Sequence, residues 1–202
     1  LVGGGMGMPR FESAEVGNLE LTWLVPLSLI GTICGWLYFV SEHASEALAH
    51  AIGERPVVKA MLAGLALAIC GTVLPYTMFA GETQADVLME TYLTIPTGVL
   101  IATGLVKAML TPALINLGWR GGHFFPVIFS GVSLGYGLAI LTGADPVFCV
   151  AVCTASTMGA VMRQPVMVVG LLLMCFPLKG IICMIIAAVI AAGIPLPKSL
   201  RK

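Results

Sequence analysis

Long apolar runs, separated by short polar or Gly- and Pro-containing breaks, make up most of the chain. These runs predict helices over residues 21–40, 57–80, 93–117, 124–141, 147–162, 166–176 and 181–192. The first helix is expected to continue into a polar extension, and Pro75 to end the second. Residues 1–20 and 81–91 are predicted to be a polar loop and a polar connection, and residues 193–202 a basic tail. Several runs are shorter than the roughly 20 residues that span a bilayer, which indicates broken and re-entrant helices.

Composition supports an all-α integral membrane protein that crosses the membrane several times. Hydrophobic residues make up 58% of the chain and charged residues 10%, where a soluble domain has about 25% charged residues. The mean hydropathy is +1.01. The net charge is zero and there is no basic tract, which argues against a nucleic-acid partner. Six cysteines lie in apolar runs without a CxxC pair, a pattern that does not favour a disulfide framework or a zinc site.

The stretch Gly121-Gly122-His123-Phe124-Phe125-Pro126 lies between two apolar runs. Two glycines leave the backbone free to turn, and a proline in the first turn suits a helix start. The first N–H groups of a helix lack intrahelical acceptors, and the helix N-terminus carries roughly half a positive charge. The sequence therefore predicts an anion site made of backbone N–H groups.

These residues resemble the GxFxP anion motif of the CLC family of chloride channels and chloride/proton antiporters. Other positions at matching spacings share the resemblance, namely Lys107, the small residues Gly131 and Gly135, and the Arg163-x-Pro165 junction. The similarity begins near residue 21. It implies that residues 21–202 form the C-terminal half of a CLC-type transmembrane domain, the second of two inverted repeats, with residues 1–20 as the remnant of a loop.

The resemblance implies a site in which the backbone N–H groups of His123 and Phe124 hold chloride, or a similar transported anion, about midway through the membrane. Gly121, Gly122 and Pro126 complete the motif. It also implies a homodimer embedded in lipid of the plasma (inner) membrane, with one pore per subunit and no cofactor. The family's serine loop and gating glutamate belong to the first repeat. We therefore expect a portion of a longer protein that requires an N-terminal repeat missing from this chain, which begins at Leu1 rather than Met.

Side chains near the motif leave alternatives open. His123 stands where the family has an apolar residue; it either responds to pH, because histidine titrates near neutrality, or packs as a neutral ring. Lys107 either attracts anions toward the pore or pairs with a carbonyl or an acid. Arg120 belongs either to the pore vestibule or to a solvated loop. Pro197 falls where the family has a pore tyrosine, which suggests a channel or a weakly coupled anion/proton exchanger.

Two competing functions are considered. His43, Glu46 and His50 share one helix face, which would suit an intramembrane metal-dependent hydrolase, but they lack the HExxH order of such enzymes. The other alternative is a half-protein remnant that dimerises without transporting. Anion transport is the preferred hypothesis, and an enzyme is not expected.

Overall fold

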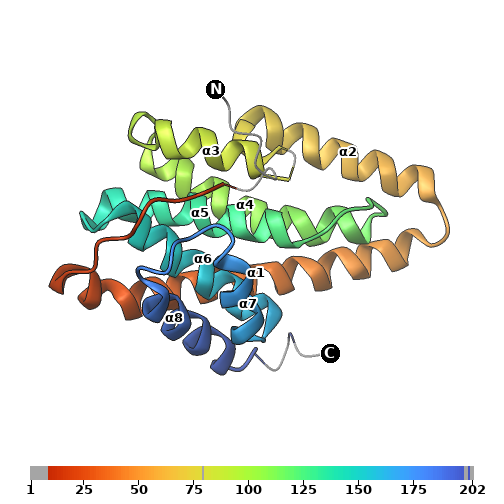
Figure 1. The fold of residues 1–202 in the computed structure, drawn as a ribbon. Helices are drawn as coiled ribbons and strands as arrows, with labels where there is room; N and C mark the ends of the chain where they lie inside the picture. The colour runs from red at the N-terminus through yellow and green to blue at the C-terminus, as the bar shows by residue number, and fades with distance from the viewer. Residues whose placement is uncertain (1–8, 79, 198–199, 201–202) are drawn as a thin grey trace.

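The protein is built of helices, and the described part of the chain contains no strand (Figure 1). The computed structural model describes residues 9–78, 80–197 and 200. In chain order the elements are α1 (Asn18–Ile52), α2 (Pro56–Val73), the 3-10 turn η1 (Pro75–Thr77), α3 (Glu82–Thr91), the 3-10 turn η2 (Tyr92–Thr94), α4 (Thr97–Asn116), α5 (Phe124–Thr142), α6 (Pro146–Met162), α7 (Pro165–Leu172) and α8 (Ile181–Gly193). The all-α fold class is confirmed.

Parts of three predicted segments lie outside the described residues. These are positions 1–8 of the polar loop, position 79 in the second predicted helix, and positions 198–199 and 201–202 of the basic tail.

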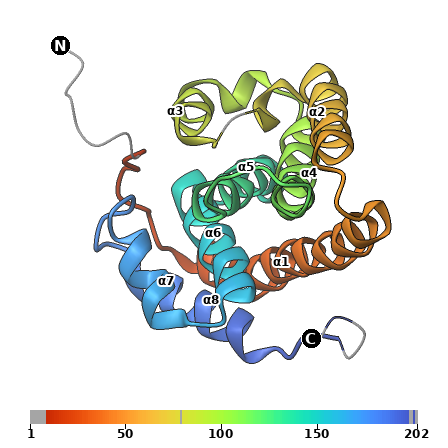
Figure 2. The same cartoon turned by 90° about the vertical axis from the view of Figure 1, so that its right-hand side faces the viewer.

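Four of the described helices are long and apolar enough to cross a membrane, namely α1, α2, α4 and α5. The protein is an integral membrane protein, as predicted. These helices differ widely in how much of their surface other helices cover: 72% of the apolar window of α5 is buried, compared with 6% for α2. Helix α5 therefore lies at the centre of the molecule, with α2 at its edge (Figure 2).

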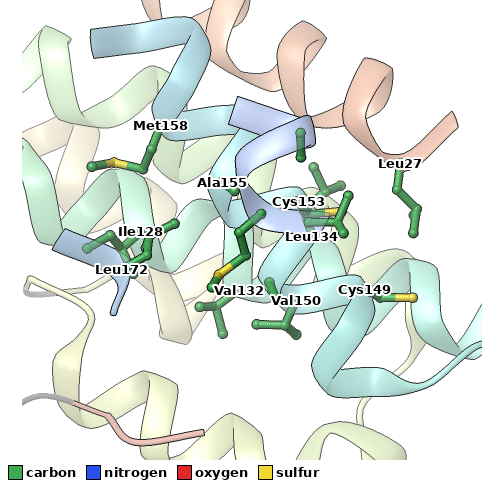
Figure 3. Packing of buried hydrophobic residues seen from close by; sticks show 14 of the residues in the cluster. Leu27, Ile128, Val132, Leu134, Cys149, Val150, Cys153, Ala155, Met158 and Leu172 are labelled. Carbon is green, nitrogen blue, oxygen red and sulfur yellow. The ribbon is translucent and has the colours of Figure 1, made fainter. Parts of the chain in front are cut away.

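Small residues allow the neighbours of α5 to approach it closely. A Cβ added at Gly135 would lie 2.5 Å from the Cα of Val150 on α6, and one added at Gly104 of α4 would lie 2.7 Å from the carbonyl oxygen of Ser130. Both neighbours are backbone atoms, so only glycine fits. Around these contacts, branched side chains of α5 and α6 such as Val132 and Val150 form a fully buried core (Figure 3). Gly131 and Gly135, four positions apart on α5, both contact the backbone of α6 in this way, a spacing that lets helices pack closely.

The prediction of a polar connection over residues 81–91 is wrong, because α3 occupies most of it. Ala85 and Leu88, three positions apart, are both buried and give this short helix an inward face. Gly81 begins the segment with φ of 108° beside Phe129 of α5. Two inward residues among polar ones give too weak a periodicity to indicate a helix in advance.

The end of the predicted N-terminal loop is irregular but is not a free polar segment. Phe11 is buried, its N–H donates to the carbonyl oxygen of Cys175 at 2.9 Å, and its ring stacks on Phe176 at a centroid distance of 4.4 Å. Helix α7 also ends at Leu172, four residues earlier than predicted. The turns that follow α7 provide the surface on which Phe11 packs.

Candidate functional site

The start of α5 presents backbone N–H groups without acceptors. Phe124 is the first helical residue, and His123 caps the helix by accepting the N–H of Val127 at 3.1 Å. No side chain caps this end, and within the described residues the N–H groups of His123, Phe124 and Phe125 have no hydrogen-bond partner. Pro126, in the first turn, has no N–H to satisfy. The predicted helix start is confirmed, and it leaves a cluster of unpaired donors at the positive end of the helix dipole.

The two glycines before this helix have a different role from the predicted one. Neither Gly121 nor Gly122 has a positive φ, so their backbone conformation does not require glycine. The sharp turn after α4 is made instead by Gly118, with φ of 98°. A Cβ added at either Gly121 or Gly122 would meet nothing within 4 Å. The two glycines therefore leave open space in front of the backbone.

That open space is part of a cavity of about 320 Å³, here named the α2–α4 cavity. Five residues singled out from the sequence line it, namely Lys107, Arg120, Gly121, Gly122 and Pro126. The remainder of its wall comes from α2, α4 and the segments that follow them, and consists of Leu67, Met78, Ala80, Leu110, Thr111, Leu114, Ile115 and Trp119. The structure thus brings two cations and the glycines of the motif to one cavity.

His123 and Phe124 do not line this cavity. Their rings stack on each other at a centroid distance of 4.5 Å, and the His123 ring lies 6.5 Å from the ring of Tyr38 on α1. The imidazole is therefore packed among aromatic rings on a different side of the helix start. Tyr38 was not singled out from the sequence, because no local pattern relates it to a residue 85 positions away.

Lys107 pairs with a backbone carbonyl, one of the two alternatives considered for it. The side chain is 4% exposed, and its Nζ donates to the carbonyl oxygen of Thr77 at 2.7 Å. It therefore fastens η1, which follows α2, to the middle of α4. The same residue also lines the α2–α4 cavity, so its attraction of anions remains a prediction.

Replacing Lys107 with methionine should separate these two roles. The buried carbonyl of Thr77 would lose its donor, so we expect the free energy of unfolding to fall by about 1–2 kcal/mol. Chloride affinity should fall as well, because the cavity loses one positive charge. Denaturant titration in micelles and calorimetric titration of chloride measure the two effects. A stability loss with unchanged affinity would leave Lys107 with the structural role alone.

Arg120 is exposed and lines the α2–α4 cavity from the loop that joins α4 to α5. Within the described residues it makes no hydrogen bond or ion pair. The loop position is confirmed, and the vestibule position remains a prediction.

The hydrolase alternative has no structural support. His50 is exposed, and Nδ1 of His43 lies 3.1 Å from the carbonyl oxygen of Phe39, within the same helix. Among the described residues, no three His, Cys, Asp or Glu side chains are placed so that they could hold a metal ion. Sharing a helix face is therefore not enough to make His43, Glu46 and His50 a metal site.

Arg163 was singled out for the junction between α6 and α7, and the structure adds a second role. It has φ of 57°, and its Nη1 donates to the carbonyl oxygens of Ala192 at 3.0 Å and Ile194 at 2.7 Å. These bonds satisfy the end of α8 and fix the segment that leads to Pro197. Sequence reasoning missed this cap because the partners are about 30 residues apart.

Comparisons with known proteins agree with this architecture. The family model described as "Voltage gated chloride channel" matches residues 3–195. Among solved structures, the crystal structure of a CLC-type fluoride/proton antiporter superposes with a TM-score of 0.76 at 20% sequence identity. The alignment covers 96% of this chain and 48% of the antiporter chain, so this chain spans about half the length of that protein.

A search of curated proteins found no match. The family match nevertheless extends over nearly the whole sequence, including the helix start, the cavity-lining loop and the junction at Arg163. The chain therefore belongs to the voltage-gated chloride channel (CLC) family.

Proposed function

We propose that the protein transports a small anion across a membrane, as a channel or a weakly coupled anion/proton exchanger. The observation that carries this proposal is the start of α5, where the N–H groups of His123 and Phe124 are unpaired and the preceding Gly121 and Gly122 line a cavity together with Lys107 and Arg120. Membership of the CLC family supports the same function. The transported anion is the ligand, and the proposal requires no cofactor or catalytic step.

Electrostatics favour an anion at this position. The helix end contributes roughly half a positive charge, and Lys107 and Arg120 contribute a full charge each. No Asp or Glu is among the described residues that line the cavity. One unit charge about 4 Å from an anion contributes roughly 1–4 kcal/mol at effective dielectric constants between those of water and a protein surface.

We further propose that this chain supplies only part of the pore. The antiporter chain is about twice as long as the region that matches, which supports a requirement for an N-terminal repeat that provides the remaining anion contacts. We also propose a homodimer in the plasma (inner) membrane. The apolar face of α7 and α8 supports it, since Val166 is 87% exposed and Ile182 69% exposed.

Anion flux from liposomes tests the function and the non-transporting alternative together. We expect the full-length protein, with both repeats, to release chloride or fluoride faster than protein-free liposomes, while residues 1–202 alone release neither. Fluoride is included because the antiporter that resembles this chain is described as a fluoride/proton antiporter. Absence of flux of both anions from the full-length protein would favour the remnant, and robust selective flux from residues 1–202 would contradict the need for a second repeat.

Weak proton coupling is expected because Pro197 has neither a hydroxyl nor a backbone N–H to donate to the anion. Proton movement per anion, measured in the same liposomes, should therefore be low or variable. Pro197→Tyr should raise it, and anion affinity should rise by about tenfold or more if the phenol adds one hydrogen bond to the anion. A tight, fixed exchange ratio in the native protein would contradict this expectation.

A further inference from the structure

The walls of the α2–α4 cavity are mostly apolar, which a site for a halide alone does not require. Leu67 of α2 and Leu110 and Leu114 of α4 line it, and Ile115 and Trp119 extend the apolar lining toward the loop. Apolar walls give no hydrogen bonds to a hydrated halide. They bind an apolar group favourably, because the contact removes apolar surface from water. The lining therefore matches a ligand that carries apolar surface in addition to charge.

The polar groups of the cavity are cationic. Arg120 offers five N–H donors in a planar fork, a shape that binds both oxygens of a carboxylate at once. Lys107 contributes a second positive charge from α4. Because no acidic side chain is among the described lining residues, the cavity would repel cations and favour a single negative charge held near the loop.

We propose that the α2–α4 cavity binds a small organic monocarboxylate, with its carboxylate on Arg120 and its apolar body between α2 and α4. The volume of about 320 Å³ is at the lower end of the roughly 300–1,000 Å³ typical of ligand pockets. It suits a body of about one ring and is too small for a phospholipid. The proposal rests on the proposed function, because Gly121 and Gly122 border both the cavity and the halide site. The carboxylate should therefore compete with the halide.

Calorimetric titration of the full-length protein in lipid nanodiscs tests the proposal with four probes: chloride, acetate, cyclohexanecarboxylate and palmitate. We expect cyclohexanecarboxylate to bind at least about tenfold more tightly than acetate, because each buried CH₂ group contributes about 0.8 kcal/mol. It should also raise the apparent dissociation constant of chloride. Palmitate should bind more weakly than cyclohexanecarboxylate, since its chain exceeds the cavity.

Matched variants locate the site. Leu67→Gln should weaken cyclohexanecarboxylate binding by about tenfold, by replacing apolar contact with a polar group. Leu65→Gln is the control, since Leu65 lies on the same helix, is 57% exposed and does not line the cavity. Arg120→Gln should weaken the carboxylate by about ten- to a hundredfold, the value of a charge-assisted hydrogen bond.

Several outcomes would overturn the proposal. These are equal affinity for acetate and cyclohexanecarboxylate, equal effects of Leu67→Gln and Leu65→Gln, or palmitate binding more tightly than the ring compound, which would indicate an open lipid groove.

Failure of the proposed transport function would give a different set of binding results. Cyclohexanecarboxylate would then bind as expected while the native protein bound neither chloride nor fluoride, which supports a carboxylate site without halide transport.

Discussion

Replacing Gly122 with valine should weaken chloride binding by about ten- to a hundredfold. A Cβ at this position meets nothing within 4 Å, so the substitution should leave the fold intact. The branched side chain would instead occupy the open space in front of the start of α5. The anion would lose at least one charge-assisted hydrogen bond from the N–H groups there, and each such bond contributes about 1.5–3 kcal/mol.

Two controls make this prediction specific. Gly98→Val introduces the same side chain at another position where a Cβ meets nothing within 4 Å, and it should not change chloride affinity. Phe124→Leu keeps the N–H group and should retain measurable binding. Calorimetric titration of chloride into the three variants compares them. Equal losses in Gly122→Val and Gly98→Val would show that the effect comes from valine in general and not from the site.

The second prediction with a large expected effect concerns the free energy of unfolding. Gly135→Val should lower the free energy of unfolding by about 3 kcal/mol, because its Cβ would lie 2.5 Å from the Cα of Val150 and 2.9 Å from the carbonyl oxygen of Cys149. These are backbone atoms, so no rotamer change relieves the overlap, and α5 and α6 must separate. Denaturant titration in micelles measures the loss.

Gly98→Val is again the matched control, since its side chain meets open space. Its stability should change by less than about 1 kcal/mol, the usual range for a substitution away from packed contacts. Comparable losses in both variants would mean that the close contact between α5 and α6 does not limit stability.

Features that depend on neighbouring residues could be predicted from the sequence. The helix start at Phe124 follows from Pro126 in the first turn, and the close approach of α5 and α6 follows from the spacing of Gly131 and Gly135. The end of α2 before Pro75 follows from the missing N–H of proline. Each of these signals lies within one or two helical turns of the structure it specifies.

Features that depend on distant residues could not be predicted. The bond from Lys107 to Thr77 joins positions 30 residues apart, and the cavity wall at Leu67 comes from a different helix. Burial of Phe11 against Phe176 joins the two ends of the chain. Helix α3 was missed because its position over Phe129, rather than its own composition, stabilises it. The division into residues 1–20 and 21–202 remains a prediction, as does assignment to the second repeat.

The sparse packing of α2 links the cavity to the thickness of the bilayer. Its 18 residues extend about 27 Å along the helix axis, slightly less than the roughly 30 Å of a typical hydrocarbon core. A helix with few protein neighbours adjusts to such a mismatch by changing its tilt. Because Leu67 of this helix forms one wall of the cavity, each change in tilt alters the cavity's width. Short-chain and long-chain lipids should therefore set different apparent anion affinities for the same amino-acid sequence.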